Sequence, residues 1–365
     1  MEEPDSPPRD KGTSSFLESA SSRFGLGEVW TRLSSKEALT IREATALPRA
    51  PLSLLFRFAS TRTTSTSTVT VRPLIYLPLA EWIERSGAAA ASSRAVKACE
   101  AASASAEIPN FFFAIDRWSG NFRLDMLLDV IATVVSVRGG DLPVTPIGPT
   151  SSDLATLRDA QSADGTPEVL ASILRQFKSY GVQAIDGGTN VELHEFAALR
   201  GFHCALGHDV SELVESAIHD PAARDLDTES FSQAYEERFV LELLDARERI
   251  GGTGKLAAWF PWYRSALRQY HPTTDQALAT PLFRILMLAR LILGERTSIR
   301  APVGLVGRNL ALVASTLGIR DLGYAALNLE TSESLGVVRL SELKTLGFPM
   351  LTVHTATQFG EERAT

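Results

Sequence analysis

Cysteine is scarce in this chain. The 365 residues include two cysteines, Cys99 and Cys204. Two thiols exclude a disulfide framework and any metal site that is built from four cysteines. We expect each to be a small buried apolar residue rather than a reactive thiol.

Long apolar runs and an excess of basic charge are also missing. No run of eighteen apolar residues occurs, so we expect no membrane-spanning helix. The net charge of −7 argues against a nucleic-acid or anionic-membrane surface. Residues 1–15 (MEEPDSPPRDKGTSS) are polar and rich in proline, and they lack the apolar core of a secretion signal. We expect this start to be disordered and the protein to be cytoplasmic.

The common cofactor and nucleophile motifs are absent too. The sequence contains no GxGxxG, HExxH or GxSxG, and GGTGK at 251–255 is too short for a phosphate-binding loop and lacks its Ser/Thr. His203 and His208 are five residues apart, with Cys204 and Asp209 beside them. Neither a helical nor a strand period brings all four to one side, so we expect no metal site.

What is present is an alternation of short apolar runs with helical segments. The composition, 44% hydrophobic and 22% charged, is that of an ordinary globular protein with ample length for a large core. Alternating strands and helices with short connections favour a parallel sheet, and an α/β TIM-like barrel in particular. The predicted strands, expected to be parallel neighbours with helices over the outer face, are 110–115, 142–147, 182–185, 202–206, 256–260 and 298–301.

The block from 281 to 293 predicts the best-defined helix. Its apolar residues recur at helical spacing and indicate one buried face. They are Leu282, Ile285, Leu286, Ala289, Ile292 and Leu293. Pro281 suits a first helical turn, and Gly294 ends the pattern. Further on, Asp321-Leu322-Gly323 is expected to open a loop.

The order of motifs from Trp259 to Leu329 resembles one known group. The pieces WFPWY, HPTTD, LFRILMLARLILGERTS and IRAPVGLVGRNLALVASTLGIRDLG resemble the C-terminal half of the radical S-adenosylmethionine (SAM) enzymes of the deazaflavin (FO) synthase, aminofutalosine synthase and dehypoxanthine futalosine cyclase group. The resemblance implies a radical-SAM-type β/α barrel, partial or full, over residues 60–355. A helical lead at 16–59 precedes it, and a frayed end at 356–365 follows it. An extra acidic segment at about 213–230 is a candidate lid or partner-binding loop, with a tolerated surface insertion as the alternative.

The chain departs from that group at its central motif. In the family, the interval that Ser60 to Val71 occupies here carries C-x3-C-x2-C, and its thiolates hold a [4Fe–4S] cluster whose open iron binds SAM. Here Ser60, Thr64 and Ser67 have the family spacing, and hydroxyls are poor ligands for such a cluster. We read the interval as a Ser/Thr-rich loop and residues 72–85 as resembling the start of the helix that follows it. We therefore expect no cluster and no cofactor, SAM being the one cofactor that the resemblance would place here.

The residues that follow the predicted strands, which are polar side chains, glycines and aromatic residues, give the candidate site. We expect them to meet at the barrel mouth, because the loops after parallel strands share one end. They are Asp116, Arg117, Trp118, Gly187, Gly188, Glu192, Gly207, His208, Asp209, Trp262, Tyr263, Arg264 and Asp321. The catalytic candidates among them are Glu192, His208 and Asp321; Gly187, Gly188, Glu192 and Gly207 are the candidates for cofactor binding. The alternatives are a solvated carboxylate for Glu192 and plain ion pairs at the rim for the set.

The functional hypotheses follow from the missing cysteines. The first is a binding or scaffold protein, a pseudoenzyme of a biosynthetic pathway, with an active radical SAM paralogue or pathway enzyme as partner. The second is a non-radical enzyme that uses the barrel pocket for a SAM-derived or aromatic, flavin-like molecule. The third is an FO synthase-like biosynthetic enzyme. An open polar pocket at the strand ends would favour ligand binding, and a plugged mouth would favour a structural role.

Overall fold

A single parallel sheet organises the computed structural model of this chain. The structure describes residues 21–61, 68–103, 110–113, 123–136, 145–161, 166–213, 229–262, 272–327, 339–346 and 351–353. Within these ranges the strand order is β7-β6-β5-β4-β3-β2-β1-β8, and β9 pairs with β1. All the strand pairs are parallel. The bounds are β1 Val69–Leu77, β2 Asn110–Phe113, β3 Thr145–Ile147, β4 Ala184–Asp186, β5 His203–Asp209, β6 Leu256–Trp262, β7 Ser298–Ile299, β8 Asp321–Ala326 and β9 Leu351–Val353.

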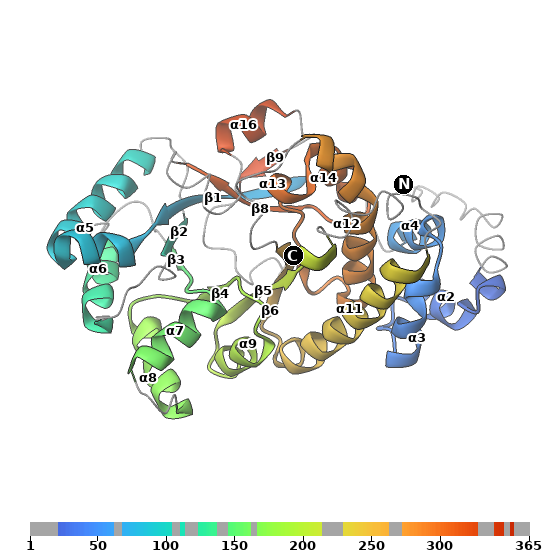
Figure 1. The fold of residues 1–365 in the computed structure, drawn as a ribbon, viewed down its shortest axis with the longest axis horizontal. Coiled ribbons are helices and arrows are strands. Elements are labelled where there is room, and N and C mark those ends of the chain that lie inside the picture. The colour runs from blue at the N-terminus through green and yellow to red at the C-terminus, as the bar shows by residue number, and fades with distance from the viewer. Residues whose placement is uncertain are drawn as a thin grey trace, which may run out of the picture.

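The sheet curls until its two ends meet. Arg300, the residue after β7, forms an isolated parallel bridge with Asp321 at the start of β8. The Ala301 amide donates a hydrogen bond to the Asp321 carbonyl oxygen at 2.7 Å. In Figure 1, β1 and β8 lie above a central space and β5 and β6 lie below it. The inner face of the sheet therefore looks toward a common centre.

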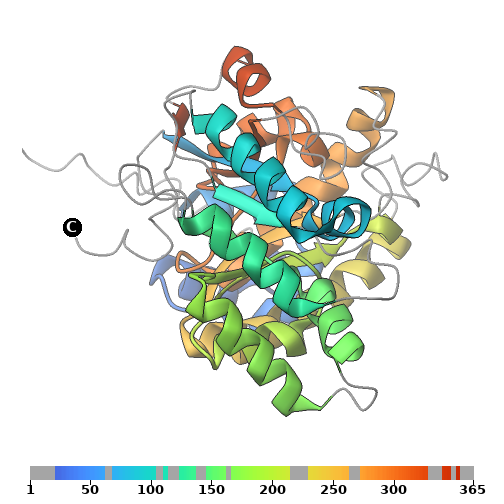
Figure 2. The same ribbon diagram turned by 90° about the vertical axis from the view of Figure 1, so that its left-hand side faces the viewer.

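The helices lie on the outer side of this curled sheet, as Figures 1 and 2 show. Those that follow the strands are α5 Leu79–Ser103, α6 Leu124–Ser136, α7 Ser151–Gln161, α8 Pro167–Ser179, α9 Val191–Ala198, α11 Glu229–Arg249, η3 Gly251–Thr253, α12 Pro272–Leu293, α13 Val303–Val306, α14 Arg308–Ser315 and α16 Leu340–Thr345. The core lies between the helices and the outer face of the sheet, where residues such as Leu206 and Trp259 are buried. Among the described helices, none is both long and apolar enough to cross a membrane.

The six predicted strands are confirmed as consecutive parallel neighbours, β2 to β7, in one sheet. Two other predictions were wrong. Residues 69–77 form β1, so the helix after the Ser/Thr-rich interval begins only at Leu79. Asp321 opens strand β8 rather than a loop. In both strands, proline, glycine or charge interrupts the apolar pattern, because the inner face of this sheet is partly polar.

Helix α12 confirms that the patterned residues are buried but not that only one face is buried, because Phe283, Met287, Leu288 and Leu291 between them are buried too. The six apolar residues of the pattern are all at most 6% exposed. The position of Pro281 was predicted wrongly: it lies inside α12, which already begins at Pro272. The apolar residues of the later turns hold the helix against the sheet and α11 despite this proline.

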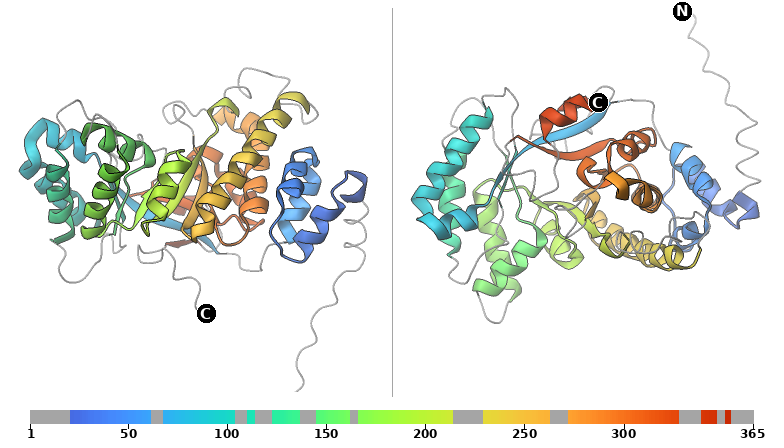
Figure 3. Two further views of the ribbon diagram at one scale, coloured as in Figure 1. Left: turned by 90° about the horizontal axis from the view of Figure 1, so that it is seen from below. Right: turned by 45° about the horizontal axis from the view of Figure 1, so that its top comes forward.

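The N-terminal helices pack on one side of the molecule. They are α2 Gly27–Ser34, α3 Ile41–Ala46, η1 Leu47–Arg49 and α4 Leu52–Thr61. Figure 3 shows them in blue, beside the later helices and away from the strands. The guanidinium of Arg284 in α12 joins them to the rest: it donates to both carboxylate oxygens of Glu236 in α11 (2.6 and 2.7 Å) and to the carbonyl oxygens of Pro48 and Ala50.

Some expectations fall outside the described residues. They concern the start at 1–15, most of the insertion at 213–230 and the end at 356–365. The division of the chain into a lead and a barrel domain stays a prediction.

Candidate functional site

Adjacent residues of β5 face opposite sides of the sheet, as the pleat of a strand requires. Gly207 faces inward: a Cβ atom built on it would lie 3.0 Å from the indole ring of Trp262. His208 faces outward and packs against α11, with its ring centroid 4.6 Å from that of Phe239. The two sides of the sheet therefore present two different polar groups of residues.

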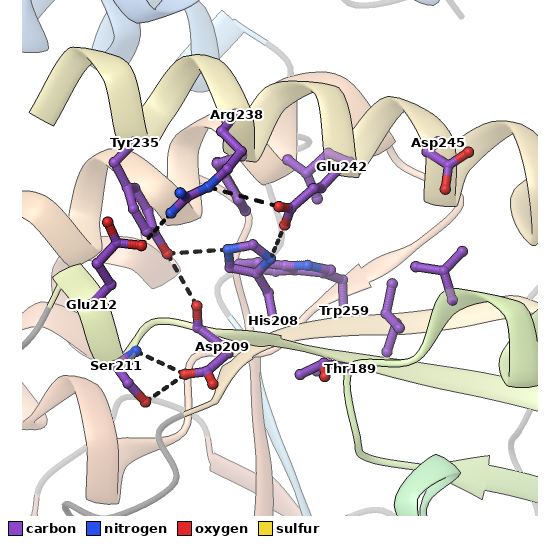
Figure 4. A pocket seen from close by; sticks show the side chains of 15 residues that line it. Thr189, His208, Asp209, Ser211, Glu212, Tyr235, Arg238, Glu242, Asp245 and Trp259 are labelled. Atoms are coloured by element: carbon purple, nitrogen blue, oxygen red, sulfur yellow. Dashed lines mark hydrogen bonds and ion pairs between the residues drawn. The ribbon is translucent and has the colours of Figure 1, made fainter. Parts of the chain in front are cut away.

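On the outer side, a cavity of about 830 Å³ opens between the carboxyl end of β5, the start of α9 and the face of α11. Its size is typical of small-molecule sites. Figure 4 shows its polar side chains converging from β5 and α11. The cavity is lined by Thr189, Val191, Leu206, Gly207, His208, Asp209, Ser211, Glu212, Tyr235, Arg238, Phe239, Glu242, Leu243, Asp245 and Trp259.

His208 stands at the centre of a hydrogen-bonded chain in this cavity. Its Nδ1 lies 3.2 Å from Oε2 of Glu242, and its Nε2 lies 3.1 Å from the hydroxyl of Tyr235. Burial lowers the pKa of His208 to about 4, so the imidazole is neutral at neutral pH. A neutral imidazole that donates from Nδ1 to the carboxylate is left with Nε2 as an acceptor for the phenol. The Tyr235 hydroxyl also lies 3.2 Å from the Asp209 carbonyl oxygen, its alternative acceptor.

Glu242 is the member of the chain that solvent reaches. Its side chain is 49% exposed, against 14% for His208. Partial burial nevertheless raises the pKa of Glu242. Arg238 is 3.9 Å away and pairs with Glu212, so the charge of Glu242 is only partly compensated. A carboxylate with a raised pKa in a cleft, held by an imidazole, is typical of binding and acid–base sites.

Aromatic side chains form the floor of the cavity behind His208. Trp259 is fully buried, and its ring centroid lies 5.6 Å from that of Phe239 and 6.2 Å from that of His208. Its indole Nε1 has no hydrogen-bond acceptor in the described part of the chain. A buried donor in this condition requires an explanation, such as a water or ligand atom that accepts from it.

The inner face of the sheet carries a second polar cluster. Nη1 of Arg300 lies 2.9 Å from both carboxylate oxygens of Asp186, and its Nε lies 3.4 Å from Oδ2 of Asp321. Arg72 also binds Asp321, at 2.8 and 3.0 Å, and Tyr324 donates to Asp186. Burial opposes the charged form of Asp321, but Arg72 and Arg300 outweigh it and lower its pKa to about 2. The two arginines and two aspartates balance in charge, and Nη2 of Arg300 has no acceptor in the described part of the chain.

The predicted glycine pair has a local packing role. Gly187 and Gly188 have φ of +101° and +81°, which side chains rarely adopt. A Cβ atom on Gly188 would lie 2.2 Å from Oγ of Ser151. The Gly188 carbonyl accepts from the Gly207 amide at 3.0 Å, so the turn joins the ends of two strands.

The other predicted site residues do not form one site, because they lie in different parts of the structure. Glu192 lies exposed in the first turn of α9 and does not line the cavity, which fits the alternative of a solvated carboxylate. Asp321 belongs to the inner cluster, whereas His208 and Asp209 line the outer cavity. Seven predicted residues lie outside the described ranges: Thr64, Ser67, Asp116, Arg117, Trp118, Tyr263 and Arg264.

Sequence reasoning missed the contribution of α11. Tyr235, Arg238, Glu242 and Asp245 line the cavity from one face of this helix. Their spacing of three, four and three residues is the signal that could have revealed them. In the described part of the chain, no group of three or more His, Cys, Asp or Glu side chains is arranged to hold a metal ion.

Comparisons with known proteins bear on the fold. No family model matches the chain, and no curated protein matches it in sequence. The structure is similar to a crystal structure of HydG, a maturase of the [FeFe]-hydrogenase, with 13% sequence identity and a TM-score of 0.50 over 95% of this chain and 76% of HydG. A HydG structure from Carboxydothermus hydrogenoformans gives 12% identity and a TM-score of 0.43, over 96% of this chain and 86% of that one. The first likeness shows a shared fold, an α/β architecture with a parallel sheet.

Proposed function

We propose that this chain is a radical-SAM-type barrel without an iron–sulfur cluster, and that it binds a small molecule in the cavity between β5 and α11. The bridge between Arg300 and Asp321 supports a closed, TIM-like barrel, because it joins the two ends of the strand order. The observation that carries the proposal is the placement of the two cysteines.

Neither cysteine is placed to hold a cluster. Cys99 lies in α5 and Cys204 in β5, both buried. The Cys204 thiol donates to the His194 carbonyl oxygen at 3.3 Å, and burial raises its pKa to about 12. A cluster needs three accessible thiolates from neighbouring positions. These residues therefore do not fit a [4Fe–4S] cluster.

The hydroxyls at the family spacing do not replace the thiolates. Ser60 is the last residue but one of α4, and its hydroxyl donates within that helix to the Arg57 carbonyl oxygen at 2.8 Å. The Ser/Thr-rich interval at 60–68 lies before β1 in the chain. The connection that follows β1 is one residue long, Pro78, and leads directly into α5. With no cluster to cleave SAM, the cavity is the feature that supports a role in binding.

The experiment is anaerobic reconstitution with iron and sulfide, followed by iron analysis and extraction of small molecules from the purified, unreconstituted protein. We expect no bound cluster and a defined co-purifying or titratable small molecule. A Val191→Trp variant, which narrows the cavity, should lose that molecule. Stoichiometric iron with visible cluster absorption would contradict the proposal, and so would ligand binding that Val191→Trp leaves unchanged.

A non-radical enzyme is the second candidate. The observation that favours it is the chain of Glu242, His208 and Tyr235, which resembles the carboxylate–imidazole pairs that move protons in acid–base catalysis. Glu242→Gln should then abolish turnover of the identified ligand, with binding retained. The relation to FO synthases and futalosine enzymes, the partnership with an active paralogue and the place in a biosynthetic pathway rest on the sequence resemblance.

A further inference from the structure

We infer that the ligand of the β5–α11 cavity is a cationic organic molecule whose ammonium group is held by the carboxylate of Glu242. This inference rests on the proposed function, because it names the chemical class of the ligand for the same cavity.

The charge of the lining is the first reason. The lining residues include four acidic residues, Asp209, Glu212, Glu242 and Asp245, and one arginine, Arg238. The carboxylate of Asp209 turns away toward Ser211, whereas the other three come from the side of α11 and Ser211. An anionic ligand would add to this excess of negative charge in a partly desolvated space, whereas a cation would reduce it.

Pairing within the protein leaves one of these carboxylates, that of Glu242, under-compensated toward the cavity. Glu212 binds Arg238, and Asp245 lies 3.6 Å from Arg249. Glu242 has Arg238 only at 3.9 Å, and Oδ1 of Asp209 accepts from the neutral Ser211 amide at 2.9 Å. Glu242 lines the cavity, so a cation between β5 and α11 would lie within its field.

The imidazole of His208 orients Glu242 without neutralising it. The 3.2 Å contact from Nδ1 fixes one carboxylate oxygen, and Tyr235 fixes the other side of the ring. Because burial lowers the pKa of His208, the imidazole is neutral at neutral pH and places no positive charge beside the carboxylate. A carboxylate held in this way is a preorganised partner for an ammonium group.

A second and independent observation points to a ligand in the same place. Nε1 of Trp259, a fully buried donor in the cavity wall, has no acceptor among the described residues. In Figure 4 the indole lies beside His208 on the cavity floor. The aromatic rings of Trp259, Phe239 and Tyr235 in the lining favour a cation over an anion.

Two matched series of probes test the inference. The first is tryptamine, tryptophol and indole-3-propionate, which share one ring system and differ in charge. The second is hexylamine, hexanol and hexanoate. Binding to the full chain is measured by calorimetry at neutral pH. We expect the amine of at least one series to bind about tenfold or more tightly than its alcohol and its carboxylate.

Variants test whether the carboxylate of Glu242 causes the preference for amines. Glu242→Gln should weaken amine binding by about tenfold or more and leave alcohol binding unchanged. Glu248→Gln is the matched control, since Glu248 is exposed on the same helix and does not line the cavity. Thermal melting establishes that the variants are folded, and Glu242→Asp should recover part of the affinity.

The outcomes separate the two proposals. If alcohols or carboxylates bind as tightly as amines, and Val191→Trp abolishes that binding, the cationic ligand is wrong and the proposed cavity stands. If amines bind and Glu242→Gln has no effect, the assignment of Glu242 is wrong. If no probe of either series binds and no small molecule co-purifies, both the inference and the proposed function are contradicted.

Discussion

Nη1 of Arg300 lies 2.9 Å from both carboxylate oxygens of Asp186, across the inside of the curled sheet. The two residues are 114 positions apart in the chain, and both side chains are almost fully buried. The contact ties the strand end after β7 to β4. It makes the inner polar cluster part of the fold.

Removing the contact between Arg300 and Asp186 should lower the free energy of unfolding. Asp186→Asn leaves the Arg300 guanidinium buried with an incomplete set of carboxylates, and loss of one partner of a buried pair costs about 3–5 kcal/mol. Urea denaturation should show this decrease in the free energy of unfolding. Asp159→Asn is the control: its side chain is 63% exposed, and we expect a change within about 0.5 kcal/mol. Equal stability of the two variants would contradict a structural role for the inner cluster.

The glycine turn after β4 should respond to added side chains through stability. Gly188→Ala combines a positive φ with a clash against Ser151, and we expect a loss of about 2 kcal/mol or more. Gly181→Ala has a similar φ of +83° in open space and should lose about 1 kcal/mol. Gly252→Ala, with neither feature, should be close to neutral. A Gly188→Ala protein of normal stability that has lost ligand binding would instead favour the cofactor-binding role.

Arg284 should control the attachment of the N-terminal helices. Arg284→Lys keeps the charge and loses the planar arrangement that binds two carboxylate oxygens and two carbonyls together. We expect residues 21–61 to become accessible to limited proteolysis at protease concentrations that leave the native chain intact. Arg308→Lys, at an exposed hydrogen bond to the Leu346 carbonyl, is the control. Identical digestion patterns would show that apolar packing alone holds these helices.

Acid should destabilise the protein through His208. The folded-state pKa of about 4 is below the unfolded value of about 6.5, so the unfolded state binds more protons between them. Stability that is fully present above pH 6.5 is therefore lost as the pH falls toward 4. The contribution is about 3 kcal/mol. His208→Phe should lose less stability than the native chain over this range, and parallel curves for the two proteins would contradict the buried, neutral imidazole.

Amine binding should weaken in acid for a different reason. Burial raises the pKa of Glu242, so its carboxylate takes up a proton at a higher pH than an exposed glutamate does. As the pH falls through that pKa, the ammonium loses its partner. The charge of Arg238 lowers the pKa of Glu242 and that of Glu212 raises it, so both act on the same curve. Alcohol binding should stay constant over this range, and amine binding that stays equally constant would argue against Glu242 as the anion.

Much of the fold could be predicted from the sequence, because the central strands are short apolar runs and the apolar residues of α12 recur at helical spacing. The six central strands and the buried residues of α12 follow from these patterns. Strands β1 and β8 could not be found in this way. Their inner positions carry Arg72 and Asp321, which long-range ion pairs stabilise, and no local pattern reveals such partners.

The site was harder to predict than the fold. The sequence-based prediction placed Gly207 and His208 in one site because they are neighbours in the chain. The pleat of β5 instead directs them to opposite faces of the sheet. The prediction also assigned Asp321 to the predicted site at the barrel mouth, although Asp321 is the first residue of strand β8 and does not lie in a loop after a strand. The helix that completes the cavity, α11, follows β5 in sequence, but only packing against Trp259 and His208 shows which of its faces turns toward them.

The position of a bound ligand tests the central claim most directly. A crystal structure of the chain with its co-purifying small molecule, or with a probe that binds, would give that position. We expect density for the ligand between β5 and α11, in contact with Glu242 and beside His208. Density on the inner face of the sheet, against Arg300 and Asp186, would contradict the assignment of the functional site.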